Sequence, residues 1–487
     1  MKKIISYQLL LAFVFIFIIR FIYHANNPVH YIFADTYQYL NRAQEIASGL
    51  PMVHYFRTPA YPILLKEILH LQGTFVVNRD TIYSINLAPV IKFQQAFGLI
   101  GAIFFIYLTY QLFGMGVIFW LTTILFGLDI HIFAWERNVL TESVVSTILL
   151  LFLFLIIKFI SKRNIFYLLL SIVTSLVLFL LRPVFFLLII SLAPFLVYYF
   201  LKNGAPGRTS RTILIAITLI SSLLFLTVPL YYAAENYRLY GFFGITNITD
   251  QDLFAKAIQY RLDATGIDSN NIYAPKLRQC ITQHKPGTWV GTDDCLYSLG
   301  IANDFQFIHS ATIAGSFAKR VIMKHPREFL VKTIKILPQV LINTDPDPFY
   351  WVSTYAKHPQ LQLVWTFLDN VYILLQKLMI AFYLFYPLSV YRFLRMPSYK
   401  NIALVIFGST VAYQIFFNAF FTQSDYIRLR NPILPELLLF CSYYYFGLFT
   451  QVRTYIKTCH SGLTGYQLVP VLSRIAKSFI RFWMRHD

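Results

Sequence analysis

The sequence predicts an all-α polytopic membrane protein, and three properties of the chain support this. Of its 487 residues, 57% are hydrophobic and only 13% are charged, whereas soluble domains are about a quarter charged. Apolar stretches of about 20 residues, the length that crosses a bilayer core, recur along the chain. The Lys and Arg residues behind the net charge of +19 lie in short loops between these stretches. Such residues orient spans and meet anionic headgroups, so the charge does not indicate nucleic-acid binding.

Hydropathy predicts about ten transmembrane helices, the first of them an uncleaved anchor because no small-residue cleavage site follows it. The remaining spans alternate with loops that are short except at two places. The expected bounds are about 4–23, 89–111, 115–134, 141–160, 164–181, 183–201, 211–232, 370–391, 401–421 and 431–450. A short interfacial or re-entrant piece is a further possibility around residues 361–368.

Lys and Arg clusters fix the expected orientation. Clusters at residues 2–3, 158–163, 202–211 and 392–400, and in the C-terminal tail, all fall on one side if there are ten spans. The positive-inside rule makes that side cytoplasmic. We therefore expect a plasma (inner) membrane protein with both termini in the cytoplasm and its two long loops outside.

The spans and loops divide the chain into four parts. These are an N-terminal transmembrane module (1–232) whose first external loop is 24–88, an extracytoplasmic segment (233–369), C-terminal transmembrane helices (370–450) and a basic cytoplasmic amphipathic tail (451–487). Loops of this length are uncommon unless they carry function or elements of their own. In the external segment, Cys280 and Cys295 could form a disulfide, although sequence spacing alone leaves the pairing open.

The first external loop contains the most informative residues. Ala34-Asp-Thr-Tyr-Gln-Tyr-Leu-Asn-Arg-Ala-Gln-Glu-Ile-Ala-Ser-Gly49 predicts an interfacial helix, and a second helix is expected from Pro59 to about Leu71. Between them runs Phe56-Arg-Thr-Pro-Ala-Tyr-Pro62, in which two prolines stiffen the turn that carries Arg57. Asp35 with Gln38 three residues later fits an N-terminal capping box, so a purely structural role is open for Asp35.

This loop resembles the first external loop of GT-C glycosyltransferases that use polyprenyl-phosphate sugars, closest to the aminoarabinose transferase and protein O-mannosyltransferase branch. The resemblance implies a GT-C-like fold with extracytoplasmic interfacial helices, and a catalytic role for Asp35 as the base that takes a proton from an acceptor hydroxyl. Many relatives carry a second acid where this chain has Thr36. A single-base mechanism is therefore expected.

Other pieces of the chain fit the same family loosely and carry candidate phosphate ligands. Arg57, the pair Arg182-Pro183 and the segment with Arg428 and Arg430 are candidates to hold the donor phosphate, because guanidinium binds phosphate oxygens in a two-pronged geometry. For each arginine, plain anchoring at the membrane interface is the structural alternative.

A further group of residues is expected to contact substrate. Glu142 and Arg137 lie in Trp135-Glu-Arg-Asn-Val-Leu-Thr-Glu142, which resembles a family motif that opens a membrane helix, and capping of that helix is the alternative for Glu142. The remaining candidates are His54, Tyr39 and Tyr61. No metal site is predicted and no cofactor is firmly predicted; a divalent metal is possible but unsupported.

The sequence thus predicts an integral-membrane inverting glycosyltransferase. It is expected to move a sugar from a polyprenyl-phosphate donor to a hydroxyl of a glycan, lipid or protein acceptor on the extracytoplasmic side, surrounded by membrane lipids and without nucleic acid. Two alternatives remain open. One is a transporter or flippase of a lipid-linked sugar, against which the chain shows no paired repeats. The other is a glycan polymerase or ligase, against which only the Asp35 and Arg57 pattern argues.

Overall fold

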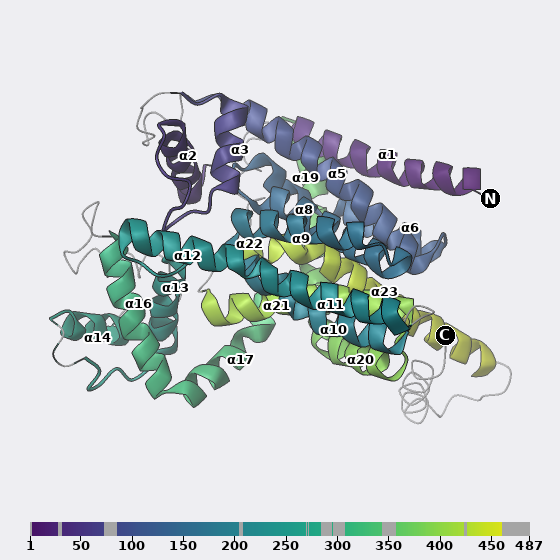
Figure 1. Ribbon diagram of the computed structural model, residues 1–487. Helices are drawn as coiled ribbons and strands as arrows, with labels where there is room; N and C mark the ends of the chain where they lie inside the picture. Colours follow the sequence, from purple (N-terminus) through teal and green to yellow (C-terminus); the bar gives the residue numbers. More distant parts are fainter. Residues whose placement is uncertain are drawn as a thin grey trace.

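The computed structural model is a bundle of long helices with shorter helices gathered at one end (Figure 1). It describes residues 2–27, 32–72, 85–203, 208–268, 270, 272–283, 295, 307–342, 357–422 and 426–459. Within these ranges all regular structure is helical. The predicted all-α fold class is therefore confirmed.

Helices of the N-terminal half come first in the bundle. They are α1 (Lys2–Asn26), α2 (Ala34–Ala47), α3 (Ala60–Leu69), α5 (Ala88–Phe113), α6 (Val117–Leu128), α7 (Ile130–Phe133), η1 (Ala134–Arg137), α8 (Glu142–Lys162), α9 (Ile165–Leu181), η2 (Pro183–Leu187), α10 (Leu188–Lys202), α11 (Arg208–Phe225) and α12 (Thr227–Tyr240). Both helices expected in the first loop are present, as α2 and α3.

Four described helices lie in the long second loop, and the described helices that come after them return to the bundle. They are α13 (Ile248–Tyr260), α14 (Ala274–Gln283), α16 (Phe307–Lys324), α17 (Pro326–Ile342), α19 (Pro359–Leu378), η3 (Met379–Ala381), α20 (Phe382–Arg395), α21 (Tyr399–Phe421), α22 (Tyr426–Arg430), η4 (Asn431–Ile433) and α23 (Leu434–Cys459). The amphipathic helix expected in the tail beyond Cys459 lies outside the described residues.

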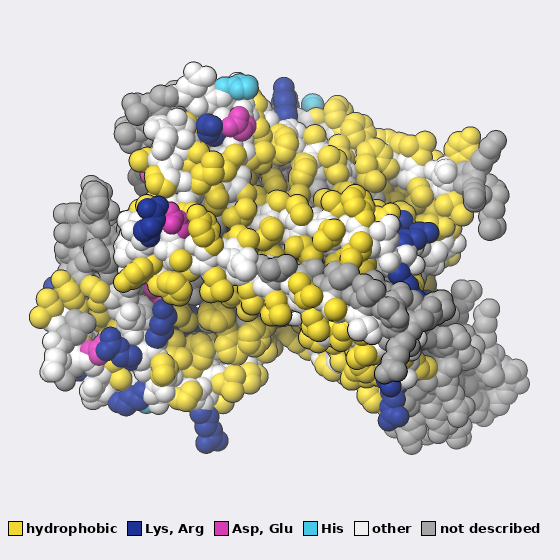
Figure 2. Space-filling model, in the orientation of Figure 1, with side chains coloured by type: hydrophobic (Ala, Val, Ile, Leu, Met, Phe, Trp, Pro, Cys, Tyr) yellow, Lys and Arg dark blue, Asp and Glu magenta, His cyan; other side chains and the backbone are white. Residues whose placement is uncertain are grey.

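Seven stretches of described helix are long and apolar enough to cross a membrane, or eight if the bent pair of α6 with α7 and η1 is one span. They are Ile5–Asn26, Ala88–Phe113, Glu142–Lys162, Pro183–Lys202, Pro359–Arg395, Tyr399–Phe421 and Arg428–Thr450. The protein is thus a multi-pass membrane protein. Large apolar side chains also cover the visible flank of the bundle between its two ends, as contact with hydrocarbon requires (Figure 2).

The shortfall from ten spans has local causes. The helix at Ile165–Leu181 is shorter than the others, and at 1.5 Å per residue it reaches about 26 Å, less than a bilayer core of about 30 Å. The expected span 211–232 is broken between α11 and α12, where Pro229 lies in the first turn of α12 and cannot donate to the helix before it. Residues 361–368 form no separate re-entrant piece, because they belong to the continuous stretch Pro359–Arg395.

The two ends of the bundle differ in what they gather. At one end, Arg163 Nη2 donates to the carbonyl of Asn203 over 2.7 Å, and Asn203 Nδ2 donates to the carbonyl of Pro397. The connections α8–α9, α10–α11 and α20–α21 therefore meet there, beside the N-terminus of α1 (Figure 1). We call this the terminal end. The opposite end, which we call the loop end, holds α2, α3, α13, α14, α16 and α17.

A second hydrophobic core stabilises the helices of the long loop. Phe254 and Ile258 of α13 pack with Leu277 of α14 and Phe317 of α16, apart from the main core of the bundle. Close approach of α13 and α16 depends on Gly315, since a Cβ there would lie 2.3 Å from Cβ of Asp250. Within the described residues of this segment, all regular structure is helical.

A disulfide joins Cys280 of α14 to Cys295, whose Cα atoms lie 6.2 Å apart. The pairing that the sequence left open is therefore formed. Both cysteines are buried in the second core. The bridge closes a short loop at the edge of this core and restrains it against unfolding.

Replacing Cys280 with Ser should weaken the second core without affecting the bundle. The bridged residues are 15 apart in sequence, and a loop of that size is worth about 3 kcal/mol of unfolding free energy. Faster hydrogen exchange in α13 and α14, with unchanged exchange in α8, is the expected measurement. Thr282→Ser, on the exposed face of α14, is the control, and equal protection in both variants would contradict a stabilising bridge.

Candidate active site

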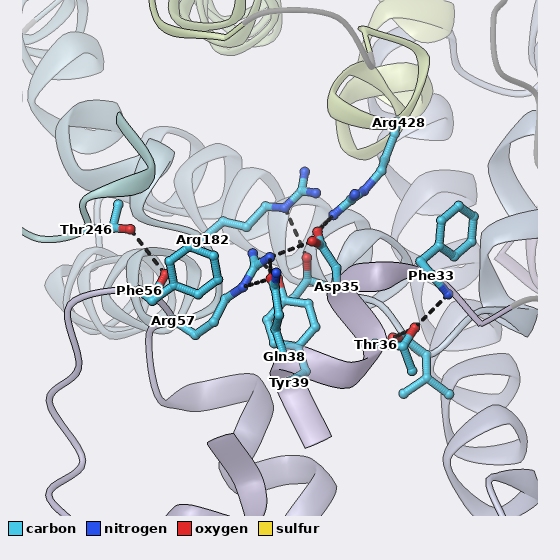
Figure 3. A network of polar contacts seen from close by, with 12 residues as sticks. Phe33, Asp35, Thr36, Gln38, Tyr39, Phe56, Arg57, Arg182, Thr246 and Arg428 are labelled. Atoms are coloured by element: carbon cyan, nitrogen blue, oxygen red, sulfur yellow. Dashed lines mark hydrogen bonds and ion pairs between the residues drawn. The ribbon is translucent and has the colours of Figure 1, made fainter. Parts of the chain in front are cut away.

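Five charged side chains from separate parts of the chain meet at the loop end of the bundle. We call this cluster the polar centre; its members are Asp35, Arg57, Glu142, Arg182 and Arg428. They come from α2, the turn before α3, the start of α8, the junction of α9 and η2, and α22. Figure 3 shows Arg57 and Arg428 reaching the Asp35 carboxylate, with Arg182 beside them.

The Asp35 carboxylate uses both oxygens for arginine. Arg57 Nη2 donates to Oδ1 over 2.6 Å, and Arg428 Nη2 donates to Oδ2. The Asp35 side chain keeps 19% of its surface exposed and both arginine side chains keep 12%. Burial alone would raise the pKa of Asp35, but Arg428 and Arg57 reverse this and hold that pKa below its usual value. The carboxylate is therefore ionised at neutral pH.

Glu142 bridges the guanidinium groups of Arg182 and Arg428. Its Oε1 accepts from Arg182 Nη2 over 2.5 Å and from Arg428 Nε. Arg182 Nε also donates to the hydroxyl of Thr141 over 3.0 Å. Thr141 therefore bonds an arginine and makes no side-chain cap to α8. Glu142 itself has no exposed surface, and it acts on the centre by fixing the two arginines.

Asp35 is free to face the arginines because another residue caps α2. The residue before the helix is Phe33, whose N–H donates to the hydroxyl of Thr36 over 3.2 Å. Asp35 lies in the first turn without making the cap, and Gln38 bonds Arg57 instead of the helix start. The capping box expected for Asp35 and Gln38 is therefore wrong.

Arg57 is held by its neighbours on α2 as well as by the carboxylate. Nε donates to Gln38 Oε1 over 3.1 Å, and Nη1 donates to the hydroxyl of Tyr39 over 3.3 Å. The guanidinium also lies 4.6 Å from the centre of the Tyr39 ring, within cation–π range. Tyr39 thus belongs to the surroundings of the centre.

The turn that carries Arg57 is fastened from two directions. His54 Nδ1 accepts from the backbone N–H groups of Phe56 and Arg57, at 3.2 and 3.4 Å. From the second loop, the N–H of Asn247 donates to the carbonyl of Tyr55 over 2.8 Å, and the Thr246 hydroxyl donates to that of Phe56 over 3.1 Å. The long second loop therefore sets the position of Arg57.

The polar centre has spare capacity for an anion. Three guanidinium groups face two carboxylates, which leaves a net charge of +1. Arg182 is only 7% exposed, and its Nη1 has no hydrogen-bond partner. A buried guanidinium donor without a partner is costly, and an oxygen of a phosphate would satisfy it.

Three other candidates bond residues outside the polar centre. Arg430 is fully buried and donates to the carbonyl of Leu341, at the end of α17, and to Gln376 Oε1 over 2.9 Å. Arg137 Nη1 donates to the carbonyl of His24 over 2.9 Å. Tyr61 is buried with its hydroxyl on Gln94. Each of these side chains bonds a structural partner and is not a member of the polar centre.

Sequence reasoning missed several residues that shape the site. Gln38 and Thr141 bond the arginines directly, yet both looked like ordinary capping residues. Asn247 begins the potential glycosylation sequon Asn247-Ile-Thr249, but it has no exposed surface and, like Thr246 before it, bonds the first loop. Among the described residues, no three His, Cys, Asp or Glu side chains lie close enough to share a metal ion.

Fold and polar centre together define a helical multi-pass membrane protein with a cluster of arginines and carboxylates at one end. No family model and no curated protein sequence matches the chain. The solved structures similar to it include two GT-C superfamily glycosyltransferases.

The oligosaccharyltransferase of Archaeoglobus fulgidus, tethered to an acceptor peptide with the NVT sequon, is 11% identical with a TM-score of 0.45. The match covers 98% of this chain but 54% of that one, so this chain spans about half its length. ArnT from Cupriavidus metallidurans, bound to undecaprenyl phosphate, is 12% identical with a TM-score of 0.31, over 99% of this chain and 85% of that one. Likenesses this distant do not bear on activity or on residue roles.

Removing the bridging carboxylate should destabilise the protein strongly. In Glu142→Ala the buried Arg182 and Arg428 lose a shared partner, and breaking a buried pair costs about 3–5 kcal/mol. A lower midpoint of thermal unfolding in detergent is expected. Glu235→Ala is the matched control, because its pair with Arg238 is at the surface and should contribute nothing measurable. Equal midpoints in the two variants would contradict the bridging role.

His54 should stay neutral throughout the physiological range. Burial, followed by the charges of Arg42 and Arg57, lowers its pKa to about 3. Between these two pH values the folded state therefore binds fewer protons than the unfolded state. The free energy of unfolding consequently falls as the pH drops from about 6.5 toward 3. In ring-labelled protein, the NMR signal absent from His54→Gln should not titrate between pH 5 and 8. Titration near pH 6.5 would contradict the buried position.

Proposed function

We propose that the protein is a membrane-embedded inverting glycosyltransferase that moves a sugar from a polyprenyl-phosphate donor to an acceptor hydroxyl. The carrying observation is the polar centre, in which one ionised carboxylate lies between arginines and one guanidinium donor is unpartnered. Its net charge of +1 suits a phosphodiester, which has one negative charge. Its place at the end of a membrane bundle suits a donor whose tail stays in the lipid.

In the proposed reaction, the acceptor oxygen attacks the anomeric carbon while the bond from that carbon to the phosphate oxygen breaks. The acceptor proton passes to Asp35, and polyprenyl phosphate leaves with a second negative charge. Arg57, Arg182 and Arg428 would stabilise that growing charge, because fixed cations at a developing charge are the largest common source of catalysis. We leave Arg430 out of the phosphate site. It would instead fix the position of α22.

The low pKa of Asp35 constrains this mechanism. A carboxylate that two guanidinium groups hold ionised is a poor base as long as both contacts persist. A donor phosphate that takes over Arg57 and Arg428 would weaken both contacts, and the pKa of Asp35 would rise toward its usual value. The base would then be strongest when the donor is in place.

Two features support placing the site on the extracytoplasmic side of a plasma membrane, with the termini in the cytoplasm. The basic connections meet at the terminal end, as the positive-inside rule requires of cytoplasmic loops. At the loop end, the Cys280–Cys295 bridge fits an oxidising compartment.

The test supplies purified protein with a labelled polyprenyl-phosphate sugar and candidate acceptors. Asp35→Asn should lower transfer by about 10²–10⁴, the usual contribution of a general base. Arg238→Gln, at a surface pair, is the control and should keep full activity. Full transfer by a folded Asp35→Asn protein would remove Asp35 from the mechanism, and movement of intact lipid across vesicles without transfer would identify a flippase instead.

The pH profile offers a separate measurement on the active protein. Because kcat/KM reports the free enzyme, and the pKa of free Asp35 lies below its usual value, no acid limb is expected between pH 5 and 7. A limb in that window that disappears in an Asp35→Glu variant would contradict the pairing of Asp35 with two arginines.

A further inference from the structure

Helix α17 carries an apolar surface that no part of the described chain covers. Leu330, Val331 and Ile334 are 46%, 43% and 53% exposed and recur at the spacing of one helix face. A helix that faced water would be polar on this side. Exposed apolar residues that cluster in this way mark contact with another molecule or with lipid.

The opposite face of the same helix is already occupied. The Phe329 ring packs 5.5 Å from that of Tyr260 on α13, and the hydroxyl of Tyr260 donates to Thr333 over 3.2 Å. Further along, Val340 and Leu341 are fully buried. The exposed apolar residues are therefore a second face, not the core face of a loosely packed helix.

Basic side chains flank the exposed face. Arg327 and Lys335 are exposed at its two ends, and neither has a hydrogen-bond or ion-pair partner within the described part of the chain. Lys324 and Lys332 lie nearby and line, with Arg327 and Lys335, a hollow of about 430 Å³. Apolar residues with Lys and Arg beside them are typical of helices that lie in the headgroup layer of a membrane.

The place of α17 in the fold agrees with that layer. Arg430 holds its last turn through the carbonyls of Val340 and Leu341, and α22, which also carries Arg428, packs beside it. The helix thus leads from the base of α16 to the level of the polar centre, where it ends beside α22 (Figure 1). A level of this kind, at the end of the membrane bundle, is where phospholipid headgroups lie.

We propose that α17 lies in the lipid headgroup layer at the loop end, with Leu330, Val331 and Ile334 inserted and with Arg327 and Lys335 bound to the phosphates of anionic phospholipids. The positive charge of the flanking residues favours anionic lipids over neutral ones. This surface is independent of the proposed transferase activity. Its effect would be to fix α17, and through Arg430 the start of α23, relative to the bilayer.

The first experiment measures depth in the full-length protein in nanodiscs. A nitroxide at Ile334→Cys, with Cys441 and Cys459 replaced and the disulfide intact, should collide with oxygen more than with an aqueous nickel complex. Gln279→Cys, exposed on α14, is the control and should show the reverse. Nickel access at residue 334 equal to that at residue 279 would overturn the insertion. Protection from both relaxing agents would indicate a protein partner or a second copy and would also overturn it.

The second experiment measures lipid selectivity. Nanodisc protein is transferred to detergent, and the phosphatidylglycerol and phosphatidylcholine that stay bound are counted by mass spectrometry. Arg327→Gln with Lys335→Gln should lower the ratio of bound phosphatidylglycerol to phosphatidylcholine, by about fivefold for each cation removed. Lys276→Gln with Arg278→Gln on α14 removes the same charge and should leave the ratio unchanged. An unchanged ratio in the first pair, or an equal fall in both, would overturn the headgroup site.

Discussion

The pairing of carboxylates with guanidinium groups at the loop end is the constraint on which the rest of the structure depends. Asp35 and Glu142 are shared among three arginines, so each contact fixes more than one segment of the chain. Charges this far from water are tolerated only when they are paired. The first loop, α8, the α9–η2 junction and α22 therefore have to come together for any of these side chains to be buried.

That requirement explains why the two long loops are tied to each other. Arg57 reaches Asp35 only because its turn is held by His54 and by hydrogen bonds that Thr246 and Asn247 donate to the backbone of the turn. On the other side of the centre, Arg428 lies in α22, two residues before Arg430, which bonds the carbonyl of Leu341 at the end of α17. The second loop thus determines the positions of two of the three arginines, although it contributes none of them.

The sequence predicted the parts of this arrangement that follow from local pattern. Apolar length predicted most of the spanning helices, and the prolines beside Arg57 predicted a fixed turn before α3. Local pattern failed where tertiary contacts compete with it. Thr141 and Gln38 are of residue types that often cap helices, yet both bond arginines instead. It also could not separate Arg428 from Arg430, because only packing decides which side of α22 faces Asp35 and which faces α17.

The same pairing that stabilises the centre also limits its chemistry. An arginine that is bonded to a carboxylate has fewer donors left for phosphate, and a carboxylate bonded to two arginines holds a proton weakly. Among the described residues, two buried atoms of the centre lack a hydrogen-bond partner: the acceptor Glu142 Oε2 and the donor Arg182 Nη1. A phosphate that first bonds this free donor could then compete for Arg428, which shares Glu142 with Arg182. Such an order would release Asp35 last, after the leaving group is already surrounded by positive charge.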